Sequence, residues 1–157
     1  MLKKSILLLL VVFAGFQQLS AQNPEKDLYL ETMGILSSQN IYMSYVYLGN
    51  IADSYIHEAI TKEFCLKLLN EYVLILDATK NQTTKLYESG YLDQEGNEAI
   101  LMQIDIYQLL KAEANAYLDF VNSGEDHFIE DFEQNRVWAW NKIEKLLGIK
   151  GSVEADK

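Results

Sequence analysis

The spacing of apolar residues is the clearest signal in this sequence. After residue 22 they recur at intervals of three and four, and nowhere do they alternate with polar residues for long enough to suggest a strand. The only proline, Pro24, stands at the start of this pattern. Because intervals of three and four place apolar side chains on one face of a helix, the sequence predicts an all-α fold.

The first predicted helix begins at Pro24, with Asn23 as its N-cap, and extends to about Ile56. Gly49-Asn50 leaves two alternatives within it. Either the helix ends there and a new one begins soon afterwards, or it continues through a locally weak point. The apolar spacing continues across the glycine, which favours one long helix followed by a turn at residues 59–61.

The second and third predicted helices each end at a Ser-Gly pair. The second carries an apolar stripe over residues 65–86 and ends at Ser89-Gly90. After a polar turn at residues 93–97, the third carries a stripe over residues 100–121 and ends at Ser123-Gly124. In both, glycine supplies the left-handed conformation that commonly terminates a helix.

A fourth helix is predicted from Asp126, its expected N-cap, to Gly148, where Ile149 behind the glycine indicates a Schellman motif. Its predicted stripe consists of Phe128, Phe132, Trp138, Ala139, Ile143, Leu146 and Leu147. Long helices joined by short turns favour antiparallel neighbours. We therefore expect an antiparallel up-down-up-down four-helix bundle.

The ends of the chain have a different composition from this pattern. Lys3 and Lys4 precede the apolar stretch 6–16, which has the length of a signal-peptide core and is too short to span a bilayer. We expect residues 1–21 to be a cleavable secretory signal, residues 22–149 to form the bundle and residues 150–157 to be a disordered tail. The protein is then exported, to a periplasm or the cell exterior.

Charge restricts the classes of partner. The formal net charge is −10, and loss of residues 1–21 leaves 11 basic against 23 acidic residues, or −12. This balance argues against nucleic acid and, after signal cleavage, against membrane surfaces, which both attract basic proteins. The single cysteine, Cys65, excludes an internal disulfide, and its place in an apolar stripe predicts a buried, unreactive thiol.

No motif in the chain predicts a catalytic, cofactor or metal site. Neither histidine, His57 or His127, completes the Glu-x-x-His pair of a di-iron bundle, and one cysteine excludes a c-type haem attachment. The acidic residues near the histidines are interpreted as a helix N-terminus and a solvated patch, and Asp93–Glu98 as an ordinary turn. Asp105 and Glu113 are the only candidates for a buried acid pair.

Aromatic residues are the unusual feature. All ten tyrosines follow residue 21, and five of them fall between residues 29 and 55. Trp138 and Trp140 are two residues apart, so one should face the core and the other the surface. Arg136, one turn before Trp140, is placed to stack on it. The candidate contact surface consists of Tyr42, Tyr45, Tyr47, Tyr55, Arg136 and Trp140.

These observations favour an exported helical-bundle protein that is not an enzyme and that mediates protein-protein interaction or self-association. Tyrosine and tryptophan supply large contact areas at low entropic cost, which suits such a role. The alternative is a bundle that binds a small molecule or a metal ion, which requires a cavity between the helices.

Overall fold

A computed structural model describes residues 24–149, with side chains from Leu28 onward. The predicted signal peptide, Asn23 and the predicted tail lie outside this range. The described chain forms α2 (Pro24–Ile56), α3 (Lys62–Glu88), α4 (Gln94–Ser123) and α5 (His127–Leu147). No strand occurs between residues 24 and 149, and the predicted all-α fold with four helices is confirmed.

The chain divides into two compact units, and the boundary between Leu36 and Ser37 lies inside α2. The described part of the first unit, residues 24–36, is helical throughout. In it the Thr32 hydroxyl donates a hydrogen bond to the Leu28 carbonyl, one turn earlier (2.8 Å). The second unit contains the rest of α2 and the three later helices.

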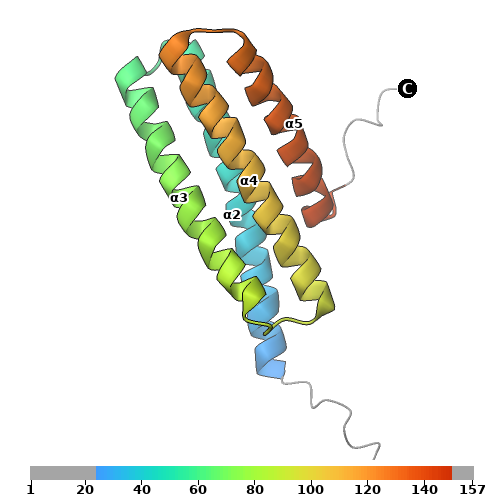
Figure 1. Cartoon of the computed structure of the whole chain (residues 1–157). Helices are drawn as coiled ribbons and strands as arrows, with labels where there is room; N and C mark the ends of the chain where they lie inside the picture. The colour runs from blue at the N-terminus through green and yellow to red at the C-terminus, as the bar shows by residue number, and fades with distance from the viewer. Residues whose placement is uncertain (1–23, 150–157) are drawn as a thin grey trace, which may run out of the picture. The chain divides into compact units, whose positions relative to one another are not determined.

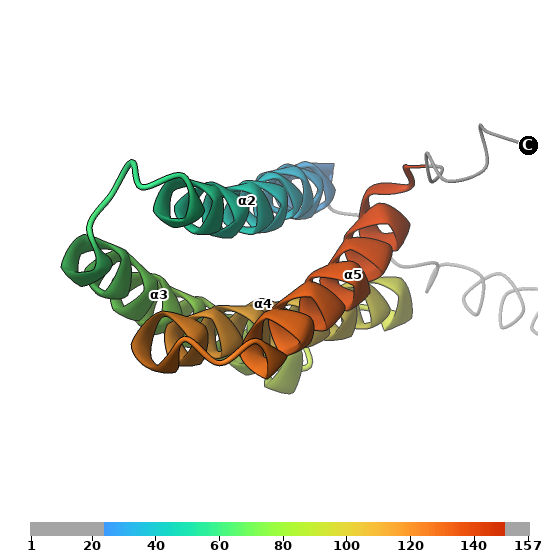
Figure 2. The same cartoon turned by 90° about the horizontal axis from the view of Figure 1, so that it is seen from above.

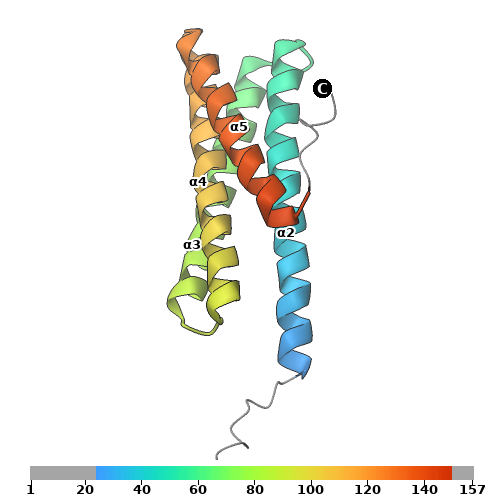
Figure 3. The same ribbon diagram turned by 90° about the vertical axis from the view of Figure 1, so that its right-hand side faces the viewer.

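Successive helices of the second unit run in opposite directions, as the up-down-up-down prediction requires (Figure 1). The helix α4 lies beside α3 on one side and α5 on the other (Figures 1 and 3). Seen from above, α3, α4 and α5 form a curved layer, and the α2 segment after Leu36 faces its concave side (Figure 2). None of the helices in the described part of the chain is long and apolar enough to cross a membrane.

The core of the second unit takes residues from every helix. The hydroxyl of Tyr72 on α3 donates to the Ser44 carbonyl on α2 (3.0 Å), and the hydroxyl of Tyr117 on α4 donates to the Ala52 carbonyl (2.9 Å). These bonds satisfy tyrosine hydroxyls that packing has removed from water. The fully buried apolar side chains include Ile41, Leu48, Leu69, Leu110, Tyr117 and Ile143.

The helix α2 continues through Gly49-Asn50, which confirms the long-helix alternative. It ends in a turn at residues 57–60. Glu58 adopts a positive φ of 57°, which is uncommon for a residue other than glycine. Its amide donates to the Tyr55 carbonyl (3.0 Å), and the next amide, of Ala59, donates to the Ser54 carbonyl (2.8 Å). This is a Schellman termination with glutamate at the left-handed position.

The predicted helix ends are confirmed at the glycines. Gly90, Gly124 and Gly148 all have positive φ. At the end of α5, the Ile149 amide donates to the Glu144 carbonyl (3.0 Å) and the Gly148 amide to the Lys145 carbonyl (3.4 Å). These two bonds are the pair that defines a Schellman motif, as the sequence predicted.

One predicted helix beginning was wrong, and another is at the predicted residue without the expected capping bond. The polar residues after Asp93 are the first turn of α4, because the Asp93 carboxylate accepts a hydrogen bond from the Gly96 amide (2.8 Å) and so caps the helix. Asp126 precedes α5 as predicted but makes no capping hydrogen bond through its side chain. Its backbone is already helical, with φ −61° and ψ −31°, whereas a capping residue normally has extended backbone.

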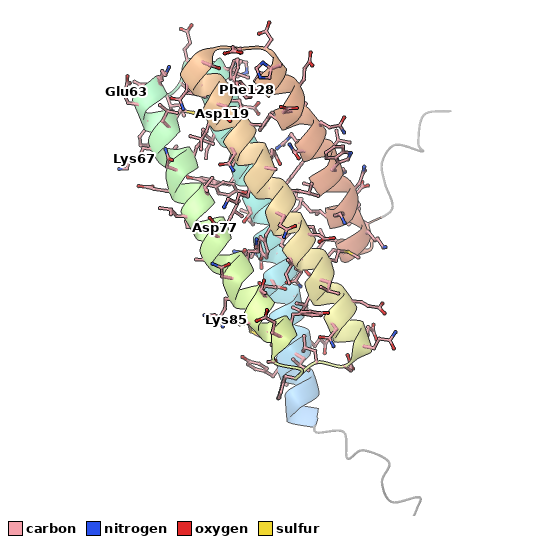
Figure 4. The ribbon with its side chains drawn as sticks, viewed as in Figure 1. Glu63, Lys67, Asp77, Lys85, Asp119 and Phe128 are labelled. Atoms are coloured by element: carbon pink, nitrogen blue, oxygen red, sulfur yellow. The ribbon has the colours of Figure 1, made fainter. Side chains whose placement is uncertain are left out.

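Some predicted core positions are exposed. Leu28, Ile35, Leu36 and Met43 belong to the apolar residues at helical spacing in the first predicted helix, and they face solvent, as does Ile75 of the second. The helix α2 has apolar residues on all sides, so periodicity alone does not identify the buried one. On α3 the charged residues are easier to place, and Figure 4 shows Glu63, Lys67, Asp77 and Lys85 spread along its length.

Candidate functional site: the buried Glu113–Arg136 pair and its aromatic neighbours

The most unusual side chain in the second unit is Glu113, a completely buried carboxylate on α4. Its Oε1 accepts a hydrogen bond from Nη1 of Arg136 on α5 (2.9 Å). Its Oε2 is also buried and has no hydrogen-bond partner. Glu113 follows Leu110 at helical spacing in the row that faces the core, so a carboxylate inside an apolar row was the available sequence signal.

The Arg136 guanidinium contacts the Glu113 carboxylate, the Tyr45 ring and the α2 backbone at Gly49. Its guanidinium stacks on the Tyr45 ring of α2, with 4.2 Å from Cζ to the ring centroid. On the same helix, a Cβ added to Gly49 would lie 2.5 Å from Nη2 of Arg136. The glycine that looked like a weak point in the first helix therefore leaves the space that the guanidinium occupies. Arg136 was predicted to stack on Trp140, and its stacking partner in the structure is Tyr45.

Burial dominates the electrostatics of this cluster. It raises the pKa of Glu113 to about 7, an effect that Arg136 opposes and the nearby Glu133 reinforces. Burial also raises the pKa of Tyr45 and of Tyr72, and the negative charge of Glu113 adds to both shifts. Glu113 therefore titrates near neutral pH between helices that it helps to join.

The structure brings part of the predicted contact surface together beside this pair. The Trp140 ring on α5 lies 5.3 Å from the Tyr45 ring and 6.4 Å from the Tyr42 ring, centroid to centroid. Tyr45 and Trp140 are half-buried against the core, and Tyr42 is exposed. The assignment of the two tryptophans was reversed, because Trp138 of the predicted stripe is 51% exposed while Trp140 packs inward.

The other two predicted tyrosines lie elsewhere. Tyr47 is 44% exposed, and its ring packs on Tyr72 of α3, with centroids 5.9 Å apart. Tyr55 packs edge-on against Tyr117 of α4 at 6.4 Å. The segment of α2 after Leu36 therefore packs against helices on two sides: it contacts α3 through Tyr47 and α5 through Tyr45.

The proposed acid pair does not form. Asp105 is exposed and binds Lys142 of α5 (2.9 Å), whereas Glu113 is buried and binds Arg136. Each carboxylate has its own cation, so the two share no proton.

The other titratable residues considered from the sequence do not converge either. Between residues 24 and 149, no three or more His, Cys, Asp or Glu side chains are grouped to hold a metal ion. His127 lies 3.5 Å from the Glu125 carboxylate, and both are exposed. Cys65 is buried, as predicted, and burial raises the pKa of its thiol to about 11, which keeps it protonated.

No protein-family model, no curated protein and no solved structure matches this chain. Its function is therefore inferred from its residues and their geometry.

Proposed function

We propose that this chain is an exported, non-enzymatic helical-bundle protein that acts by associating with a protein surface. The observation that carries the proposal is the scarcity of charge on α2. Charged residues make up 23% of the chain, yet Glu31 is the only one from Leu28 to Ala52. Large apolar side chains are exposed in each unit: Leu28, Tyr29, Met33, Ile35 and Leu36 in the first, and Tyr42, Met43 and Tyr47 in the second.

Exposed apolar residues that occur singly are ordinary, but a concentration of them on one helix marks a site of interaction. Charge is depleted and aromatic residues and methionine are enriched in the centres of protein interfaces, which matches the composition of this stretch. The remaining helices carry most of the charge of the described chain, and this charge keeps the rest of the surface hydrated.

The cluster around Arg136 gives part of this surface a rigid support. Tyr42 is exposed and rests on Trp140, and Trp140 in turn contacts Tyr45, on which Arg136 stacks. A side chain held in one position loses little entropy on binding. Tyr42 and Tyr47 are thus the members of the predicted contact surface that a partner would touch, and Tyr45, Arg136 and Trp140 hold their surroundings in place.

The first experiment is native mass spectrometry of the chain purified from an export-competent host, with capture of binding partners on the immobilised protein. Loss of residues 1–21 from the measured mass would support export, and their retention would contradict it. Tyr42→Ala should reduce self-association or capture about tenfold. Tyr91→Ala, an exposed tyrosine at the α3–α4 turn, is the matched control and should change neither. Equal loss in both variants, or no association in any sample, would overturn the proposal.

A small-molecule site is the second candidate, favoured by the unpartnered Oε2 of Glu113. A buried acceptor of this kind is costly unless a donor reaches it. The same mass spectrum tests this role. An added mass that Glu113→Gln removes would establish a ligand, and a spectrum of the bare chain at every ionisation energy would count against one.

A further inference from the structure

The turn between α2 and α3 differs in its chemistry from the two later turns. It consists of residues 57–61, and of the turns between the described helices it is the one without a glycine. Gly90 and Gly124 supply the positive φ of the later turns, whereas here Glu58 adopts a φ of 57°. This left-handed conformation is strained for a residue with a Cβ and unstrained for glycine. The chain therefore turns at a residue that resists the turn.

The local sequence of the turn favours a helix. Neither glycine nor proline occurs from residue 53 to residue 88, and Glu58 and Ala59 are good helix formers. The closed turn is supported by packing, because Ile60 is half-buried against the core. Local preference and tertiary packing thus disagree at a short hinge, and strained short hinges are the ones that open to exchange an element with another copy.

The bonds that hold α2 in the second unit come from side chains of α3 and α4. The Tyr72 hydroxyl donates a hydrogen bond to the Ser44 carbonyl (3.0 Å), and the Gln103 amide donates one to the Ser37 hydroxyl (3.0 Å). Neither bond involves the turn. An α2 that arrives from another copy in the same direction makes the same bonds and buries the same apolar side chains.

The directions of the helices fit such an exchange. Within the second unit α2 and α3 run antiparallel (Figure 1). With the turn extended as helix, α2 continues along the line of its own α3 and leaves its place beside α3, α4 and α5 empty. When two such copies lie side by side in opposite directions, each α2 enters that place in the other copy, again antiparallel to α3. Two-fold symmetry closes this arrangement as a dimer.

We propose that two copies of this chain exchange α2, so that α2 and α3 form one continuous helix in each copy and each Arg136 stacks on the partner's Tyr45. The exchange keeps the contacts of the core and removes the strained conformation of Glu58 from both chains. It goes beyond the proposed function, because it uses the buried face of α2 and leaves Tyr42 exposed for other contacts.

The test is the state of association of the full chain, purified from an export-competent host, unfolded in urea and refolded at about 1 μM or about 1 mM. Size-exclusion chromatography with light scattering separates dimer from monomer. Glu58→Gly gives the turn a residue that adopts positive φ without strain and that disfavours the continuous helix. The matched control is Glu71→Gly, which removes another glutamate, 58% exposed, from the interior of α3. Its loss of helix propensity is the same in the monomer and in the exchanged dimer.

We expect refolding at the higher concentration to yield a dimer, and the ratio of dimer to monomer to fall at least about tenfold in Glu58→Gly. The ratio in Glu71→Gly should change less than about threefold. The dimer of the natural sequence should persist for about hours after dilution, because α2 must leave the core before it exchanges.

Three results would overturn the exchange of α2: a monomer at every concentration, a dimer that dissociates within seconds of dilution, or an equal loss of dimer in both glycine variants. A dimer that Tyr42→Ala weakens and Glu58→Gly does not would also refute the exchange, and it would leave the proposed contact surface standing. A dimer that only Glu58→Gly weakens supports the exchange and leaves the contact surface to the capture experiment.

Discussion

At the scale of single residues, Arg136 is the position on which most of the unusual features of the second unit depend. Its guanidinium binds the buried Glu113 carboxylate, stacks on Tyr45 and lies against α2 where Gly49 has no side chain. A planar guanidinium satisfies all these contacts at once, which the compact ammonium of lysine does not. Burying the pair costs desolvation free energy, and its contacts connect Arg136 on α5 to Glu113 on α4 and to Tyr45 on α2 within this unit.

Glu113 should make the stability of the protein depend on pH. Because burial raises its pKa in the folded state from 4.5 to about 7, the folded state holds the proton more tightly than the unfolded chain does. The contribution of Glu113 to the free energy of unfolding is therefore greatest below about pH 4.5 and falls as the pH rises to about 7, by ~3 kcal/mol.

The measurement is the free energy of urea unfolding for the natural sequence and for Glu113→Gln, from about pH 4 to 8. The amide does not titrate, so the difference between the two proteins isolates the contribution of this carboxyl. We expect the natural sequence to lose stability relative to the variant as the pH rises. A difference that stays constant over this range would contradict the shifted pKa.

Gly49→Ala should destabilise the protein although alanine favours helices. The added Cβ would lie 2.5 Å from Nη2 and 3.1 Å from Cζ of Arg136, so the guanidinium must shift from the position in which it contacts both Glu113 and Tyr45. We expect a loss of about 1–3 kcal/mol in the free energy of unfolding, after the gain of ~1 kcal/mol in helix propensity. Gly34→Ala is the control on the same helix, because nothing lies within 4 Å of a Cβ at that position. Gly34→Ala should stabilise, and a stabilised Gly49→Ala would show that Arg136 does not need this space.

At the scale of helices, the four elements differ in how clearly the sequence marks their limits and buried faces. The helices α4 and α5 bury apolar residues at regular spacings and leave most of their charged residues outside, with Glu113 as the buried exception, whereas α2 has apolar residues on all sides. A helix of the second kind needs contacts on more than one face. In the second unit the segment of α2 after Leu36 finds them on α3, α4 and α5.

The aspartates that precede α4 and α5 can be compared by mutation. Asp93→Ala removes the carboxylate that caps α4, and we expect a loss of about 1 kcal/mol in the free energy of unfolding. Asp126→Ala removes an aspartate that precedes α5 without a capping bond from its side chain. We expect it to lower the free energy of unfolding by only about 0.3 kcal/mol. Thermal unfolding of both variants gives the comparison. Equal losses would mean that Asp126 caps α5 in solution.

At the scale of the whole molecule, the core of the second unit holds one chemical reporter, the Cys65 thiol. The side chain is fully buried, and burial raises its pKa to about 11. A thiol reagent reacts with the thiolate and therefore needs the protein to open. The core residue thus reports on cooperative unfolding of the unit that contains it.

We expect Cys65 of the native protein to react with a thiol reagent at a rate that follows the opening equilibrium, at least about 1,000-fold more slowly than in denaturant. Gly49→Ala should speed the reaction about tenfold for each ~1.4 kcal/mol of stability that it loses. Absorbance of the released thiol dye measures both rates. Rapid labelling of the native protein would show that the thiol is accessible and that its burial does not describe the protein in solution.

By itself, the sequence determined the helical class, the number of helices and most of their ends. These features depend on local chemistry: apolar residues at intervals of three and four, the only proline at the start, and glycines that adopt positive φ at residues 90, 124 and 148. It also marked Cys65 as buried, since the thiol lies in an apolar row. Export, the signal peptide and a role in association are further predictions from the same sequence.

Only the tertiary structure decided which residues meet. The pairing of Glu113 with Arg136, the space at Gly49, and the inward position of Trp140 in place of Trp138 each depend on how α2, α4 and α5 pack in the second unit. The positive φ of Glu58 also could not be predicted from the sequence, because glutamate rarely adopts this conformation and the turn imposes it. Periodicity gives the faces of each helix separately, and contacts between helices that lie far apart in sequence then select the face that is buried.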